Sequence, residues 1–182
     1  MNNSPGTLRL RVVVAVAAGI LVAAMAVSAA FGATRREAHL PSLDRQVLAA
    51  INAFRTRHHL TPLRLARTLD RSAGQHSLQM GKLGYFAHSS ANGTSFWQRI
   101  QHYYSARSYA YWSVGENLLW AAPSVSAGRA LSMWIASPEH LRNLLSPQWR
   151  QIGISAVHVL DAPGVFGGSN VTIITTDFGV RR

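Results

Sequence analysis

One glutamate constrains this chain more than any other residue. Glu116 lies in the stretch 111–120, YWSVGENLLW, whose other members are mostly apolar or aromatic. Such neighbours predict that its side chain is at least partly buried, and a buried carboxylate needs a cation, a metal ion or several hydrogen-bond donors. The chain holds only seven acidic residues. We therefore expect the fold to be organised around the partners of Glu116.

Two histidines are the candidate partners of this carboxylate. His88 follows two aromatic residues and precedes two serines, at the start of a loop that the turn dipeptide Asn92-Gly93 marks. His140 falls in the first turn of a helix that Ser137-Pro138 begins. Three segments of the chain can thus converge on one polar site. His76 lies instead on an apolar helix stripe, where we expect a hydrogen-bonded core histidine rather than a ligand.

The N-terminal segment has the pattern of a secretory signal. Arg9 and Arg11 precede an apolar run over 12–27, and small residues follow at 28–30. We predict a signal peptide over 1–30, a linker over 31–42 and one domain over 43–180. The alternative is an uncleaved anchor, because residues 12–33 are long enough to span a bilayer. Either interpretation places the domain outside the cytoplasm, secreted, extracellular or periplasmic, with membrane contact only through the signal or anchor.

Composition narrows the chemistry and the partners. The chain has no cysteine, which excludes disulfides, thiol chemistry and a cysteine-ligated zinc. A formal net charge of +11 favours polyanions such as anionic envelope components. No helix-turn-helix, RNP-like or zinc-finger pattern accompanies that charge, so we expect no specific nucleic-acid partner. We expect the domain to be a monomer.

Periodicity indicates helices first and paired strands last. Apolar spacing predicts helices over 43–58, from about 69 to 84, over 95–102, around 127–134 and from 138 to 145. β-branched runs predict strands over 152–160 and 171–178, joined as a hairpin. This order favours an α+β domain over alternating βαβ units. The aromatic residues 103–112 are interpreted mainly as core, with an aromatic wall along a groove as the alternative.

Short motifs in a fixed order carry a family resemblance. They are Asn52 with Arg55, Leu60-Thr-Pro-Leu63, Ala73 with His76 and Met80, Phe86-Ala-His88, Gly115-Glu-Asn117, residues 134–143 (WIASPEHLRN), Gly153-Ile-Ser155 and Asp177-Phe-Gly179. Each motif alone is weak, but the ordered set resembles the bacterial branch of the CAP superfamily, the SCP-like extracellular domain. The resemblance implies an α-β-α sandwich with a central cleft.

The resemblance also implies a set of site residues. Members of this family line the cleft with a tetrad of His and Glu, and some hold a divalent metal, often zinc, on the two histidines. The matching positions here are His88, Glu116 and His140, with Asn117 beside them. The fourth position departs, because Ser137 stands where the family has its other glutamate, and Glu139 lies outside the motif position. The expected metal ligands are therefore His88 and His140, with Glu116.

Three function classes follow. The first is a non-enzymatic module that binds a small apolar or amphipathic ligand, or an envelope component, in the cleft. The second is a metal-dependent hydrolase of peptide or envelope polymer, in which Glu116 accepts a proton from metal-bound water; no other catalytic residue is assigned. The third is a structural or adhesive domain that uses its basic surface. A serine hydrolase is disfavoured, because the chain has no Gly-x-Ser-x-Gly elbow. We favour the first class.

Overall fold

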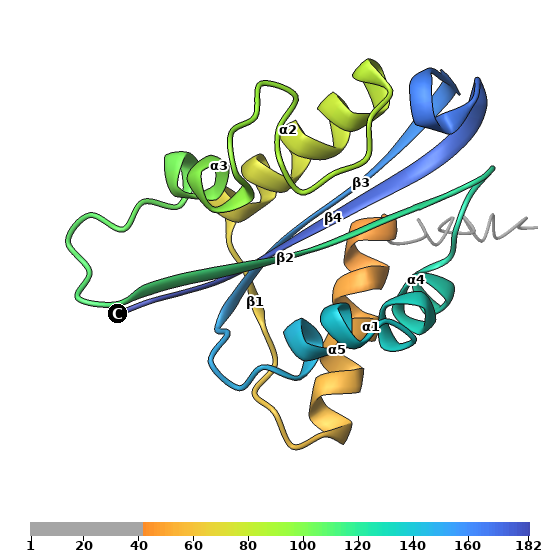
Figure 1. The fold of residues 1–182 in the computed structure, drawn as a ribbon. Helices are drawn as coiled ribbons and strands as arrows, with labels where there is room; N and C mark the ends of the chain where they lie inside the picture. The colour runs from red at the N-terminus through yellow and green to blue at the C-terminus, as the bar shows by residue number, and fades with distance from the viewer. Residues whose placement is uncertain (1–41) are drawn as a thin grey trace, which may run out of the picture. The chain divides into compact units, whose positions relative to one another are not determined.

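The computed structural model describes residues 42–182 (Figure 1). The predicted signal peptide or anchor over 1–30, and the linker as far as residue 41, lie outside the described residues. Within 42–182, no helix is both long and apolar enough to cross a membrane.

A four-stranded sheet forms the middle layer, with the strand order β1-β3-β4-β2. β3 (Gln151–Ala162) and β4 (Ser169–Arg181) are the predicted hairpin, although both strands are longer than the sequence indicated. β2 (Trp112–Ala121) pairs antiparallel with β4, and the short β1 (Arg64–Leu65) pairs parallel with β3. β2 is therefore an edge strand.

The sequence pattern indicated no strand at β2, and burial explains why. The middle of this strand, from Gly115 to Leu119, is buried, although side chains in a strand alternate between its two faces. A strand covered on both faces loses the apolar–polar alternation by which strands are recognised in a sequence. The stretch around Glu116 is thus an edge strand with helices over both of its faces.

Helices cover both faces of the sheet (Figure 1). α2 (Arg67–Leu83) and α3 (Phe96–Tyr103) lie on one face. α1 (Leu43–Arg57), α4 (Ala127–Ile135) and α5 (Pro138–Leu145) lie on the other. All five correspond to predicted helices, with ends that differ by a few residues. The expected α+β fold, an α-β-α sandwich, is confirmed.

Three apolar clusters fill the spaces between these layers in the described part of the chain, and one of them consists of Ala66, Leu69, Ile100 and Tyr104. The remaining two have more members. The larger joins α1, α4 and α5 to the sheet and includes Ile51, Trp134, Leu144, Ile152 and Phe178. The other packs the end of α2 against the opposite face and includes Met80, Leu118, Phe166, Val171 and Ile173. Gly84, with a φ of 72°, ends α2 in the left-handed conformation that glycine favours.

The motif residues Asn52 and Arg55 are structural. Asn52 exchanges two hydrogen bonds with the backbone of Leu63, which fixes the loop after α1. Arg55 is fully buried, and its guanidinium donates to the carbonyl oxygens of Leu144 and Ser146 at 2.8 and 3.0 Å. These bonds satisfy carbonyl groups at the C-terminus of α5, which no residue of the helix itself can reach. Arg55 thus holds α5 on α1.

Two aspartates cover the part of β3 that the short β1 leaves unpaired. Oδ1 of Asp70, near the start of α2, accepts from the backbone N–H of Ile154 at 3.0 Å. Oδ1 of Asp44, near the start of α1, accepts from the N–H of Ala156 at 2.6 Å. Both bonds also anchor a helix to the sheet.

Gly153 is expected to be essential for the packing of α2 on β3. A Cβ atom at this position would lie 2.0 Å from the carbonyl carbon of Leu69, so the helix would have to move. Gly153→Ala should lower the free energy of unfolding by about 3 kcal/mol or more, measured by urea denaturation. Gly128→Ala in α4 is the control, because nothing lies within 4 Å of its Cβ position. It should be neutral or stabilising by up to about 1 kcal/mol. Equal effects of the two changes would contradict this account.

Candidate functional site

Strand β2 places the Glu116 side chain in the interior, as its neighbours in the sequence indicate. The side chain is only 1% exposed. Its Oε1 lies 2.7 Å from Nδ1 of His88, whose own side chain is 52% exposed. Its Oε2 pairs with the guanidinium of Arg99. Both oxygens of the carboxylate are therefore engaged, one by a histidine at the surface and one by a buried cation.

Arg99 is a site residue that sequence reasoning missed. It lies on α3 and is only 4% exposed. Besides Glu116, it donates to the carbonyl oxygen of His88 at 2.9 Å and to Oγ of Ser90 at 3.3 Å. Arg99 therefore fixes both the carboxylate and the loop that carries His88. Nothing local distinguished it from the chain's other arginines, since its partners are distant in the sequence.

A second carboxyl group lies beside Glu116. Asp177 on β4 stands directly opposite Glu116 in the sheet register and is fully buried. Burial, and next the negative charge of Glu116, raise the pKa of Asp177 well above its usual value. These causes favour the protonated, neutral form of Asp177. From the sequence, Asp177 was recognised only as part of the Asp177-Phe-Gly179 motif and the predicted strand 171–178, and was assigned no role at the site.

His76 is the hydrogen-bonded core histidine that its helix stripe indicated. It is fully buried on α2, and its Nε2 donates to the carbonyl oxygen of Ala87 at 2.9 Å. Burial is the largest cause that lowers its pKa, to about 4. The imidazole is therefore neutral at physiological pH, with its proton on Nε2. Its hydrogen bond to Ala87 fixes the residue that precedes His88.

The other wall of the site comes from α5. Asn117 donates to the carbonyl oxygen of His140 at 3.1 Å, and Asn143 donates to the carbonyl oxygen of Glu116 at 3.1 Å. Asn143 also donates to Oδ1 of Asn117 at 2.8 Å. A Cβ atom on Gly115 would lie 2.9 Å from the Asn143 oxygen, so the glycine permits this close approach. Burial lowers the pKa of His140.

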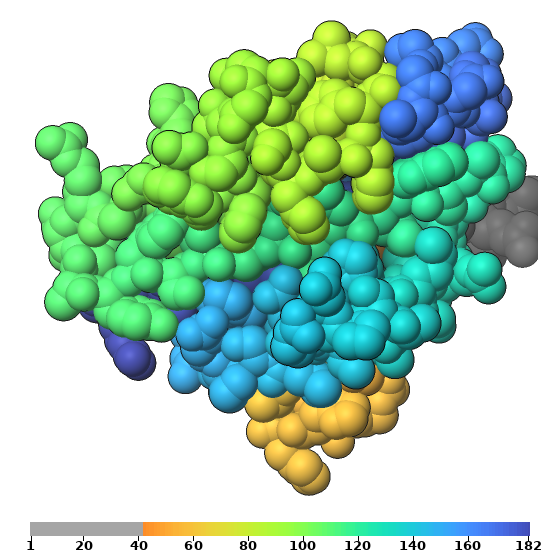
Figure 2. Space-filling view, viewed as in Figure 1, coloured from red at the N-terminus to blue at the C-terminus, as the bar shows by residue number. Residues whose placement is uncertain are grey.

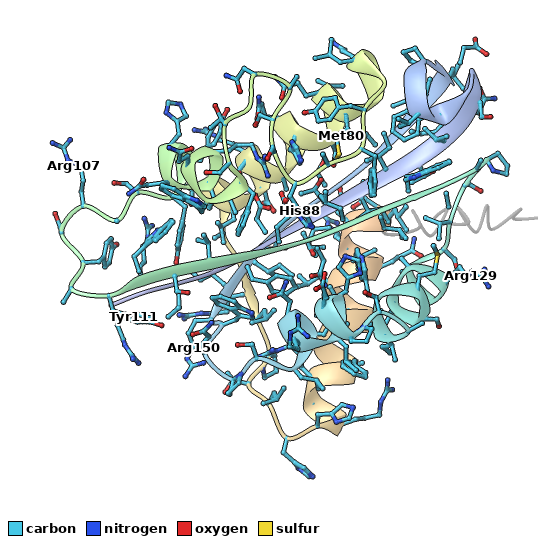
Figure 3. The ribbon with its side chains drawn as sticks, viewed as in Figure 1. Met80, His88, Arg107, Tyr111, Arg129 and Arg150 are labelled. Atoms are coloured by element: carbon cyan, nitrogen blue, oxygen red, sulfur yellow. The ribbon has the colours of Figure 1, made fainter. Side chains whose placement is uncertain are left out.

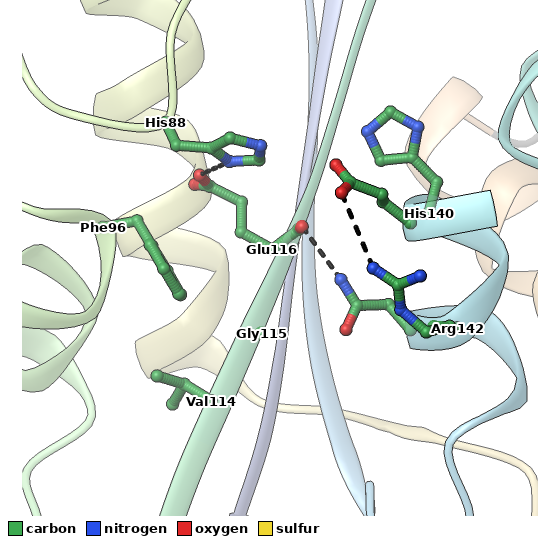
Figure 4. A pocket seen from close by; sticks show the side chains of 9 residues that line it. His88, Phe96, Val114, Gly115, Glu116, His140 and Arg142 are labelled. Atoms are coloured by element: carbon green, nitrogen blue, oxygen red, sulfur yellow. Dashed lines mark hydrogen bonds and ion pairs between the residues drawn. The ribbon is translucent and has the colours of Figure 1, made fainter. Parts of the chain in front are cut away.

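These two walls enclose a pocket over the edge of β2, here called the edge pocket. Its volume is about 410 Å³, and its lining is His88, Phe96, Val114, Gly115, Glu116, Glu139, His140, Arg142 and Asn143. Figure 4 shows His88 and Glu116 on one side of β2, and His140 with Arg142 on the other. In Figure 2 the green surface of β2 runs between the yellow-green atoms of the α2–α3 layer and the cyan atoms of α5.

A smaller apolar pocket adjoins the edge pocket at His140, which lines both. It measures about 280 Å³ and is lined by Phe86, Leu118, Leu119, Trp120, Met133, Trp134, Ser137 and His140. Ser137, the residue at the fourth motif position, therefore lies here and does not line the edge pocket. Asn117 is fully buried and serves as a brace for α5.

The three predicted zinc ligands line one pocket, but among residues 42–182 they are not grouped closely enough to hold one metal ion. The structure brings His88 to Glu116, whereas His140 stands on the opposite wall of the edge pocket. Among residues 42–182, no three His, Asp or Glu side chains are grouped so that they could hold one metal ion. Catalytic zinc sites take three protein ligands. The donor set as placed does not fit such a site, and zinc binding stays a prediction.

Comparison with known proteins bears on the family and the fold. Residues 48–165 match the profile of the family described as CAP, the cysteine-rich secretory protein family. The uncharacterized protein YkwD of Bacillus subtilis (strain 168) is 27% identical over 124 residues, which cover 68% of this chain and 46% of YkwD. The chain thus spans less than half the length of that relative.

Two solved structures are similar to the chain. An outer surface protein from Borrelia burgdorferi has a TM-score of 0.60 at 22% identity, covering 76% of this chain and 92% of that one. An extracellular protein with an SCP domain from Bacillus anthracis str. Ames has a TM-score of 0.59 at 25% identity, covering 76% of this chain and 40% of that one. Both matches support the same fold.

Asp177→Asn tests whether Asp177 is a neutral acid in the folded protein. Because folding raises its pKa, the aspartate contributes stability at low pH that is lost as pH rises from the unfolded value through the folded one. The asparagine has the same shape and carries no proton to lose. The variant should therefore gain stability over the parent as pH rises from 4 to 7, measured by urea unfolding. Asp161→Asn, at an exposed acid, is the control. A variant that is less stable than the parent at pH 7 would mean that Asp177 is ionised.

His76→Gln should remove a loss of stability that the parent shows as pH falls, which is the opposite direction to the effect of Asp177. The folded pKa of His76, about 4, lies below the unfolded value of 6.5, so its contribution is complete above pH 6.5 and is lost as pH falls towards 4. At about 1.4 kcal/mol per pKa unit, the parent should lose about 3 kcal/mol over that range through this group. Glutamine can keep the bond to Ala87, so the variant should lack this loss in urea unfolding at pH 7, 5.5 and 4.5. Exposed His102→Gln is the control, and identical slopes in parent and variant would contradict the assignment.

Proposed function

Because this chain belongs to the CAP family, we propose that it is a secreted or envelope-associated domain that binds a small amphipathic ligand, without chemical turnover, at the edge pocket and the apolar pocket beside it. Two similar structures bear on the location: one protein is described as extracellular and the other as an outer surface protein. An N-terminal secretory signal, predicted from the sequence, agrees with that location.

The state of Glu116 carries the proposal. A general base in a hydrolase must reach a water molecule with a free oxygen. Here one oxygen of Glu116 is bonded to His88, the other is paired with Arg99, and the side chain is 1% exposed. The carboxylate is thus positioned to hold the walls of the pocket, and it has little access to a substrate. Binding is the function that this geometry supports.

The two adjoining pockets favour an amphipathic ligand. The edge pocket offers polar groups from His88, His140 and Arg142. The apolar pocket offers Phe86, Trp120 and Met133. Since His140 lines both, a ligand with a polar head and an apolar tail can place the head over β2 and the tail against α4. Burial of the tail would provide most of the affinity.

Surface charge plays a secondary part in this proposal. Arg107, Arg129 and Arg150 are exposed and lie at separate places around the domain, while His88 lies near its centre beside β2 (Figure 3). Such scattered charges favour weak attraction to an anionic envelope surface over one specific contact. They would concentrate an anionic ligand near the pocket without selecting it.

Met133→Trp should block the tail of the ligand. The larger side chain fills part of the apolar pocket, so the affinity of the purified chain for decanoate should fall by about tenfold or more, measured by calorimetry. Ile135→Trp is the matched control, because Ile135 lies on the same helix, is exposed and does not line the pocket. Its affinity should equal that of the parent.

Zinc separates this proposal from the hydrolase alternative. On this proposal we expect weak zinc binding, with no one-to-one complex in a calorimetric titration at neutral pH. Stoichiometric binding that is lost in His88→Ala and His140→Ala, together with hydrolysis of a peptide or envelope polymer that is lost in Glu116→Gln, would overturn the non-enzymatic proposal.

A further inference from the structure

A second polar pocket shares Arg99 with the Glu116 site but shares no lining residue with the edge pocket. It is here called the amide pocket, and it lies among α2, α3 and the loop between them. Its volume is about 370 Å³, within the range of roughly 300–1,000 Å³ that small-molecule sites occupy. Its lining is Gln75, Gln79, Ser90, Asn92, Thr94, Gln98, Arg99, His102 and Tyr103. Four of these residues carry a side-chain amide, so amide groups are the main polar groups of the pocket.

Three of these amides are fixed in orientation by the protein itself. Oε1 of Gln98 accepts from the backbone N–H of Ser95 at 3.2 Å and from its hydroxyl at 2.8 Å. Oδ1 of Asn92 accepts from the N–H of Thr94 at 3.1 Å. Oε1 of Gln79 accepts from the hydroxyl of Tyr85 at 3.2 Å. Each carbonyl oxygen is occupied by a donor, so each NH₂ group is left to face away from that partner.

The pocket is therefore rich in donors. An amide NH₂ carries two N–H donors, and within residues 42–182 none of these three NH₂ groups donates a hydrogen bond to the protein. Gln75 supplies the complement, because its buried Oε1 has no hydrogen-bond partner among the same residues. A small turn of that side chain would let the oxygen accept from a ligand N–H. These NH₂ donors and the Gln75 oxygen match a ligand with several oxygen acceptors and one amide donor.

Charge argues for a neutral ligand. Among the lining residues, no aspartate or glutamate is present, and the charge of Arg99 is already offset by Glu116. At one end, the half-buried ring of Tyr103 offers an apolar surface beside His102, with 4.9 Å between the two ring centroids. An aromatic surface next to polar groups suits the C–H face of a sugar ring.

We propose that the amide pocket binds one residue of a neutral, N-acetylated glycan, separately from the ligand of the edge pocket. The hydroxyl and acetyl oxygens accept from Gln79, Asn92 and Gln98. The acetamido N–H donates to Gln75. The ring packs on Tyr103.

The test is calorimetric titration of the purified full chain with the β-1,4-linked tetramer of N-acetylglucosamine. Gln79→Glu, Asn92→Asp and Gln98→Glu each keep the oxygen that accepts the internal hydrogen bond and replace the free NH₂ group with a carboxylate oxygen, which adds one negative charge. Each should weaken binding by about 3- to 10-fold, the effect of one hydrogen bond. Gln101→Glu, exposed on the same helix as Gln98 and outside the pocket, adds the same charge and should leave the affinity unchanged.

Further probes distinguish the glycan from other ligands and from the edge pocket. The glucose tetramer with the same linkage should bind at least about fivefold more weakly, because it lacks the acetamido group. Met133→Trp should leave tetramer binding unchanged. The proposal is overturned if the parent does not bind the tetramer, if sulfate competes with it, if Gln101→Glu weakens it as much as the pocket variants do, or if Met133→Trp abolishes it.

Discussion

The buried ion pair between Arg99 and Glu116 is the interaction on which the rest of the site depends. Both partners are withdrawn from water, a state that is stable only while each satisfies the other. Through Arg99, the pair connects strand β2, helix α3 and the loop that carries His88. Removing one partner of such a pair typically costs about 3–5 kcal/mol, because the other is left as an uncompensated buried charge. The walls of both polar pockets rest on this pair.

Asp177 adds a second buried acid beside this ion pair. Two carboxyl groups stand opposite each other on β2 and β4, but the structure provides one buried guanidinium for them. Burial, and next the negative charge of Glu116, raise the pKa of Asp177 and so favour its protonated form. Glu116 is the one of the two that contacts the guanidinium and the histidine. The strand register thus places a second buried acid directly beside the ion pair.

Features of the fold and the site were predictable from the sequence where they depend on residues close together in the chain. The helices were predicted because periodicity and caps are local, as at Ser137-Pro138. The burial of Glu116 followed from its flanking residues, and His88 from its place at a loop. Arg99 and Asp177 could not be found in this way, because one is a helix arginine with distant partners and the other lies within a strand. β2 was not predicted for a different reason. Both of its faces are covered, so its sequence lacks the alternation of apolar and polar residues by which strands are recognised.

The two aspartates of α1 and α2 that bind β3 have a consequence for association between molecules. A strand whose N–H groups are unpaired can accept a strand from another chain and so extend the sheet. Here Asp44 and Asp70 already occupy the N–H groups of Ala156 and Ile154. An incoming strand would have to displace both carboxylates and release the ends of α1 and α2 from the sheet. Two of the chain's few acids thus keep this sheet from growing at the β3 edge.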